Sequence, residues 1–187
     1  MNLWVGMGMF EISDTPIAGV RFLKPRIHQD PRGEFVKTFH ADFFLEHGME
    51  FVPQEQFFSV SSKDVVRGLH FQRPPSDHAT LAFCTTGRIR DVVVDLRASA
   101  QFGRVHSYEL TAKGREMLFI PKGCAHGFLT LEEGSTVFYL TDAVYDPTND
   151  DGILWNSIDF DWGVSNPILS NRDWAFKSLR EFSSPFA

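Results

Sequence analysis

The sequence predicts an all-β fold, because short apolar runs of strand type recur along it, turn residues separate them, and helical periodicity is sparse. The expected strands are residues 57–60, 80–84, 89–96, 117–120 and 136–140. The turns expected between them contain Gly87, Gly114, Gly123 and Gly134, each beside a charged residue. Several short strands joined in this way are typical of a β-sandwich or a β-barrel.

The two ends of the chain predict shorter elements that flank this β-rich region. Residues 41–48 favour a short helix that closes at Gly48, because glycine fits the left-handed backbone at a helix C-terminus. From Asn149 onward, tryptophans and prolines occur without a clear period, so we expect loops and short helical turns packed over the sheets. The chain has 187 residues and no internal repeat, which predicts one domain spanning residues 1–187.

Charge and hydropathy exclude several classes of protein. The 18 Lys and Arg residues against 24 Asp and Glu residues give a net charge of −6, which argues against a broad nucleic-acid-binding surface but leaves room for a small anionic ligand. No apolar run reaches the ~18 residues of a membrane span. The first residues lack the basic and apolar regions of a secretion signal. We therefore expect a cytoplasmic protein that binds neither nucleic acid nor membrane.

The rarer residue types narrow the candidates for chemistry. Cys84 and Cys124 are too few and too far apart for a disulfide framework or a cysteine-rich metal site, and we expect both to be small buried side chains. The chain has 19 Phe and only 3 Tyr, so most aromatic rings are expected in the core. Tyr108, Tyr139 and Tyr145 carry hydroxyl groups and are therefore the aromatic candidates for a functional site.

Two of the seven histidines stand in unusual sequence surroundings. Strand alternation places His70 and Gln72 on one face of residues 67–72. His126 follows a strand and a turn in residues 120–128. Either histidine alone also fits a structural imidazole. The pair, about 55 residues apart, has the spacing of a cupin, but a metal-binding cupin offers more ligands than these two imidazoles, so we expect no metal.

A specific resemblance covers residues 15 to 175. The motifs that carry it are residues 30–35, 61–63, 67–72, 91–97, 120–128, 139–141 with Tyr145, 152–156 and 168–173. In this order and spacing they resemble the dTDP-4-dehydrorhamnose 3,5-epimerase family. The resemblance implies a cupin-type double-stranded β-helix, or jelly roll, with short flanking helices and no metal or cofactor. It also implies a homodimer in which the partner chain helps to complete each nucleotide site.

The resemblance further implies a substrate class, a nucleotide diphosphate-linked 4-keto-6-deoxyhexose, and roles for site residues. His70 matches the catalytic base, Asp173 the carboxylate that orients it, and Tyr139 the proton donor. The residues implied in substrate binding are Tyr145 beside the sugar, Arg67 and His126 at the pyrophosphate, and Arg32, Gln72, Lys37 and Thr80.

Three departures from the family pattern bear on the activity. Thr80 occupies the position of a lysine that helps to stabilise the enolate, and losing such a donor weakens catalysis by ~2.7–4 kcal/mol. His78 and Arg73 are nearby substitutes. Near the nucleobase, Glu55, Phe57 and Lys37 replace a glutamine, an asparagine and a glutamate, which predicts a poor match to thymine. Ser157 replaces an aspartate, with no consequence that the sequence explains.

The sequence therefore favours an epimerase that removes a proton beside a C4 ketone and inverts one or two carbons. Two alternatives stay open. One is a 3,4-ketoisomerase, which begins with the same proton abstraction. The other is a cupin that binds a nucleotide sugar without converting it, which the missing lysine favours. A metal-dependent oxygenase or isomerase is a more distant alternative.

Overall fold

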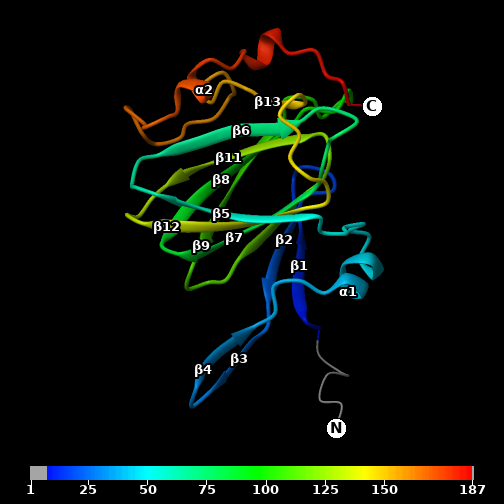
Figure 1. Ribbon diagram of the computed structural model, residues 1–187, viewed down its shortest axis with the longest axis vertical. Coiled ribbons are helices and arrows are strands. Elements are labelled where there is room, and N and C mark those ends of the chain that lie inside the picture. Colours follow the sequence, from blue (N-terminus) through cyan, green and yellow to red (C-terminus); the bar gives the residue numbers. More distant parts are fainter. Residues whose placement is uncertain (1–7, 187) are drawn as a thin grey trace.

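A computed structural model describes residues 8–186, and their strands form a six-stranded sheet, a five-stranded sheet and a separate hairpin (Figure 1). The six-stranded sheet contains, from edge to edge, β1 (Phe10–Asp14), β2 (Arg21–Pro25), β10 (Met117–Ile120), β7 (Thr80–Thr86), β12 (Ser135–Thr141) and β5 (Glu55–Ser61). The five-stranded sheet contains β13 (Asp150–Gly152), β6 (Val66–Gln72), β11 (Cys124–Thr130), β8 (Arg88–Asp95) and β9 (Val105–Thr111).

The two sheets are antiparallel and lie face to face, as in a jelly roll (Figure 1). Strands β3 (Ile27–Asp30) and β4 (Gly33–Val36) form the hairpin, which projects away from the sheets. The short helices are α1 (Ala41–Glu46), α2 (Asn171–Trp174) and the 3₁₀ turn η1 (Leu179–Glu181). The predicted all-β class with short flanking helices is confirmed.

Strand β8 shows why the predicted apolar runs fold as they do. Ile89 and Val93 face the other sheet, where they pack in a buried cluster with Ala82 and Phe128. Its alternate residues Val92 and Val94 face outward into a second cluster, formed with the C-terminal segment. Because β8 is covered on both faces, six of its eight residues are buried, and these include the carboxylates Asp91 and Asp95 as well as its apolar residues. The C-terminal segment, which includes the buried Trp155 and Trp162, covers the outer face of the five-stranded sheet (Figure 1).

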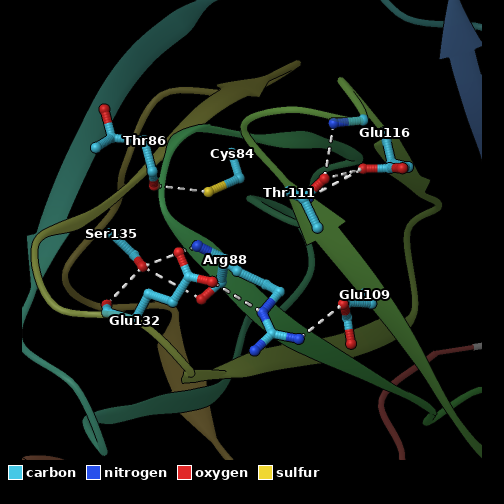
Figure 2. A network of polar contacts seen from close by, with 9 residues as sticks. Cys84, Thr86, Arg88, Glu109, Thr111, Glu116, Glu132 and Ser135 are labelled. Carbon is cyan, nitrogen blue, oxygen red and sulfur yellow. Dashed lines mark hydrogen bonds and ion pairs between the residues drawn. The ribbon is translucent and has the colours of Figure 1, made fainter.

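A network of internal polar contacts lies at the end of the sheets where β7 turns into β8 and β12 begins, and this end is called the closed end below (Figure 2). The fully buried Ser135 hydroxyl accepts the Arg88 N–H at 3.1 Å, and Glu132 O lies 2.7 Å away as its hydrogen-bond acceptor. The Arg88 side chain reaches Glu109 and Glu132, each at 3.2 Å. Gly87 has φ +72°, and a Cβ there would lie 2.3 Å from the Ser135 hydroxyl oxygen, so this turn requires glycine.

Most predicted elements are confirmed, including the five strands and the helix near residue 41, where Gly48 has φ +73°. Cys84 and Cys124 are free and buried as expected, and burial raises their thiol pKa to about 11 and about 12. Strands β1–β4, β9, β11 and β13 were not among the predicted strands. In β1, β3 and β9, charged and polar residues alternate with few apolar ones, because at least one side of each faces water. In the described residues no helix has the length and apolar character needed to cross a membrane.

Candidate active site

A cavity of about 360 Å³ occupies the end of the space between the sheets that lies opposite the closed end. Its walls come from both sheets and from the C-terminal segment. Phe57, Ser59, Thr80, Tyr139 and Thr141 come from the six-stranded sheet, and Arg67, His70, Gln72, Cys124 and His126 from the five-stranded sheet. His78, Tyr145, Asp150 and Arg172 complete the polar lining. The volume lies within the range of small-molecule sites.

Two neighbouring strands bring the imidazoles of His70 and His126 to the same wall of this cavity. The residues are directly paired in the register of β6 and β11. Close approach of the strands depends on glycine, since a Cβ on Gly68 would lie 2.5 Å from Gly127 Cα. The strand alternation that placed His70 and Gln72 together in the sequence is confirmed, because both line the cavity.

His70 is held by a carboxylate from the opposite end of the sequence. His70 Nε2 lies 2.9 Å from Asp173 Oδ1, and the Gly68 N–H donates to Asp173 Oδ2 at 3.3 Å. Burial alone would raise the pKa of Asp173, but hydrogen bonds from His70 and Gly68 hold that pKa below its ordinary value. Asp173 is therefore an anion at neutral pH. With Nε2 bound to it, His70 has Nδ1 free to take a proton.

Tyr139 lies on the other sheet from His70. Its ring stacks on Phe57 with the centroids 4.8 Å apart, and its hydroxyl is 3.2 Å from Ser59 Oγ. Burial raises the pKa of the Tyr139 phenol well above its ordinary value, although the Ser59 hydrogen bond opposes this. The phenol is therefore protonated at neutral pH, as a proton donor requires.

His126 has its own carboxylate partner. Its Nδ1 lies 3.3 Å from Asp91 Oδ2, and Asp91 is fully buried. Burial raises the pKa of Asp91, and the nearby His126 lowers it. The His126 ring also lies 6.2 Å from the Tyr139 ring, between centroids. This contact joins the wall that carries the imidazoles to the wall that carries the phenol.

Cationic groups line the rim of the cavity. Arg67 Nε donates to Ser61 Oγ at 2.9 Å, which leaves part of its guanidinium free for an anion. Arg172 pairs with Asp150 at 2.6 Å, and the Tyr145 hydroxyl donates to the same carboxylate at 3.1 Å. Arg67 and Tyr145, for which the sequence implied pyrophosphate and sugar contacts, thus both line the cavity.

Sequence reasoning missed four residues of this site: Asp91, Asp150, Arg172 and Phe176. Phe176 lies edge-on to His70 at 5.7 Å between centroids, and the Arg172 guanidinium lies 5.2 Å from its ring. The signal for Arg172 was its position next to Asp173 in the chain. Asp91 looked like an ordinary residue of an apolar strand, although a carboxylate on the inner face of such a strand is itself unusual.

Arg32 and Lys37 are not brought to this cavity within one chain. Arg32 lies at the tip of the β3–β4 hairpin, where it pairs with Asp30 at 2.6 Å, and Lys37 directly follows β4. Neither residue lines the cavity, whereas Arg67, Gln72, Thr80, His126 and Tyr145 all do. The structure thus gathers all but these two of the residues that the sequence placed in the site.

Two of the departures from the family pattern have a structural account. Ser157 donates to Leu154 O at 2.7 Å and accepts the Leu179 N–H at 2.9 Å, so it fixes the C-terminal segment. Glu55 accepts the Tyr145 N–H at 2.8 Å, which ties the edge strand to the loop at the cavity rim. In residues 8–186 no group of three or more His, Cys, Asp or Glu side chains is placed to hold a metal ion.

Comparison with known proteins agrees with this geometry. Residues 14–181 match the family described as dTDP-4-dehydrorhamnose 3,5-epimerase. The chain belongs to this family. It is 41% identical over 174 residues to the dTDP-4-dehydrorhamnose 3,5-epimerase of Escherichia coli (strain K12), covering 89% of this chain and 93% of that one. It is 35% identical to the dTDP-4-dehydrorhamnose 3-epimerase of Streptomyces niveus, covering 84% and 78% of the two chains.

A solved structure supports the same assignment. The dTDP-6-deoxy-D-glucose-3,5-epimerase of Legionella pneumophila, in complex with dTDP-4-keto-L-rhamnose, superposes with a TM-score of 0.88. It is 31% identical in sequence, and the match covers 93% of this chain and 95% of that one. The resemblance found in the sequence, the cupin-type jelly roll and the assignment to the epimerases are confirmed.

Proposed function

We propose that this protein epimerises a nucleotide diphosphate-linked 4-keto-6-deoxyhexose, with His70 as base and Tyr139 as acid. The observation that carries the proposal is their placement on opposite walls of one cavity. His70, oriented by Asp173, comes from the five-stranded sheet, and the protonated Tyr139 comes from the six-stranded sheet. A base and an acid on opposite faces of a sugar ring are what inversion at a carbon requires.

The reaction follows from these positions. The C4 ketone acidifies the C–H bonds on C3 and C5, and His70 Nδ1 takes the proton as the C–H electron pair forms the enolate. Asp173 stabilises the imidazolium that results. Tyr139 then gives its hydroxyl proton to the opposite face of the same carbon. His70 returns its proton to water and the Tyr139 phenolate takes one up, which restores the starting state.

The cationic rim supports binding of the diphosphate. Arg67, His126 and Arg172 all line the cavity, and guanidinium groups bind phosphate oxygens at two points. Arg172 is paired with Asp150, so we propose that phosphate competes for this guanidinium when substrate binds. Phe57 presents a ring rather than an amide to the cavity, so we expect the CDP, UDP and GDP sugars to differ from the dTDP sugar in how well they bind.

A homodimer would complete the site, and we propose one. The β3–β4 hairpin projects from the sheets with Phe35 57% exposed (Figure 1). On the edge strand β5, Phe58 is 60% exposed and stacks on Phe138 at 5.2 Å. A second copy that covers these apolar groups would bring Arg32 and Lys37 toward its neighbour's cavity. Sedimentation of the wild type as a dimer and of Phe58→Glu as a monomer would support this arrangement.

We also propose that the chain works as a single domain, because the site combines residues from Phe57 to Phe176. The cytoplasmic location expected from the sequence stays a prediction. A second candidate function is that of a 3,4-ketoisomerase, which would use the same base. Thr80 in place of a cation favours this candidate, so the experiment below also tests it. It differs in the product, since the carbonyl moves from C4 to C3.

The decisive experiment is NMR of dTDP-4-keto-6-deoxyglucose with the protein in deuterated buffer. Parallel samples contain His70→Ala and the CDP, UDP and GDP forms of the sugar. Deuterium at C3 or C5 with the wild type but not with His70→Ala is expected, and the labelled carbons report whether one or two centres invert. A carbonyl shifted to C3 identifies the ketoisomerase. Folded protein that binds one of these nucleotides yet exchanges no deuterium would be a binding module instead.

A further inference from the structure

The proposed reaction leaves one need unmet, a group that stabilises the negative charge on the C4 oxygen. The basic side chains Arg172, Arg67 and His126 around the cavity already have partners. Arg172 pairs with Asp150, and Arg67 donates to Ser61 and to Val60 O. His126 faces Asp91. We propose that His78 and Thr80 form an uncharged donor site for this oxygen, in which the neutral His78 imidazole donates its Nε2 proton. The inference rests on the proposed epimerase function.

The tautomer of His78 follows from the hydrogen bonds of Gln72. Gln72 Oε1 accepts the Asp146 N–H at 2.6 Å, and Gln72 Nε2 donates to Ser76 O at 2.9 Å. These two bonds fix which end of the amide is nitrogen. The same Nε2 lies 3.0 Å from His78 Nδ1, and an amide nitrogen can only donate. His78 Nδ1 is therefore the acceptor, and the ring proton is on Nε2.

The same contacts keep His78 neutral. A proton on Nδ1 would face the Gln72 N–H group and break this hydrogen bond. Burial lowers the pKa of His78, the nearby His126 and Lys122 lower it further, and Asp142 and a hydrogen bond with the Ser76 backbone oppose them. A neutral imidazole that donates through a fixed N–H is an effective electrophile at a carbonyl, because it does not have to reorganise as charge develops.

The backbone between His78 and Thr80 is held firmly. The Ala79 N–H donates to Asp142 Oδ1 at 2.7 Å, and the Asp142 N–H donates to Ala79 O at 3.3 Å. Thr80 begins β7, and both residues line the cavity. Among residues 8–186 the Thr80 hydroxyl has no hydrogen-bond partner, whereas its neighbour Thr141 donates to Ala143 O at 2.9 Å. The Thr80 hydroxyl is thus available for a ligand.

The first test compares deuterium exchange by the wild type with exchange by His78→Phe, His78→Gln and Thr80→Val. His78→Phe keeps a planar ring without a donor, and we expect its kcat to fall by about 10²-fold while KM changes by less than about threefold. His78→Gln restores an N–H donor and should recover most of that loss. Thr80→Val should lose about 10-fold. His106→Phe, on the exposed part of β9, is the matched control and should match the wild type.

The second test reads the tautomer directly in the wild type, so it stands even if a variant misfolds. Long-range ¹H–¹⁵N NMR of the His78 ring should show the proton on Nε2 at pH 7.5, and Gln72→Leu should release this preference. A ring protonated on Nδ1 or on both nitrogens would overturn the inference. So would wild-type exchange rates in folded His78→Phe. If the wild type itself exchanges no deuterium, the epimerase proposal falls, and the inference falls with it.

Discussion

The space between the two sheets is built differently at its two ends, with a polar network at the closed end (Figure 2) and the cavity at the other. At the closed end, the Ser135 hydroxyl and the Cys84 thiol both form hydrogen bonds within the protein. The hydroxyl accepts the Arg88 N–H, and the thiol donates to Thr86 O. At the cavity end, His70 Nδ1 and the Thr80 hydroxyl have no hydrogen-bond partner among residues 8–186, while their neighbours are firmly fixed. The same type of antiparallel strand supports both ends.

This difference separates stability from reactivity. A polar group that bonds within the protein contributes to folding, and its loss leaves a buried partner unsatisfied. A polar group that faces a cavity contributes little to folding but is available to a substrate. Substitutions at the closed end should therefore change the free energy of unfolding at constant kcat, and substitutions at the cavity end should do the reverse.

The largest effect is expected for Asp173→Asn. The amide keeps the shape but cannot stabilise an imidazolium on His70, so the deuterium exchange rate should fall by about 10³-fold or more. The measurement is the initial rate of exchange at saturating substrate. Asp159→Asn, on an exposed carboxylate of the same segment, is the control. An Asp173→Asn rate within a few-fold of the wild type would remove the pair from the mechanism.

Tyr139→Phe should separate proton removal from inversion. His70 still abstracts the proton and exchanges it with solvent, but no acid remains on the opposite wall. Epimerised product should fall by about 10²-fold, while deuterium still enters the substrate with its configuration retained. NMR of the recovered sugar distinguishes the two results. Loss of exchange and of inversion in parallel would assign Tyr139 a binding role instead.

The sequence predicted the walls of the cavity better than its rim. Apolar runs of strand length identify β7, β8, β10 and β12, because strands buried on at least one face need such residues. The family resemblance pointed to His70 and Asp173 together, although 103 positions separate them and only the folded chain brings them within 2.9 Å. Arg172 and Phe176 were missed because their roles depend on this same long-range contact.

The hairpin shows a different limit. The sequence placed Arg32 and Lys37 in the substrate site, but within one chain they lie on or beside a projecting β-ribbon. A two-stranded ribbon is marginally stable alone, so its position depends on what covers it. Sequence motifs report that a residue belongs to a site without reporting which copy of the chain supplies it.

At the closed end, Ser135→Ala should change stability alone. The hydroxyl bonds to Arg88 N, Arg88 O and Glu132 O, and its removal deprives the Arg88 N–H of this acceptor, while Arg88 O still accepts the Leu131 N–H. Urea unfolding should show a loss of about 1–3 kcal/mol. Arg88→Met, which removes only half-exposed ion pairs, should lose at most about 1 kcal/mol. A kcat that fell with either change would mean that the two ends are coupled.

The smallest expected effect is a pH-dependent contribution of His78, at the cavity end, to the free energy of unfolding. The pKa of His78 is lowered by burial and by the charges of His126 and Lys122, while Asp142 and a hydrogen bond with the Ser76 backbone oppose this shift. The unfolded chain therefore binds a proton at His78 near pH 6.5, where the folded chain does not. Stability is full above this pH and falls as pH drops through 6.5 toward the lowered pKa, by at most about 1.4 kcal/mol per pH unit. His78→Phe lacks this titration, so the stability difference between wild type and variant should shift in favour of the variant between pH 7.5 and pH 5. Urea titrations at both pH values measure it, and a constant difference would show that His78 takes up its proton equally in both states.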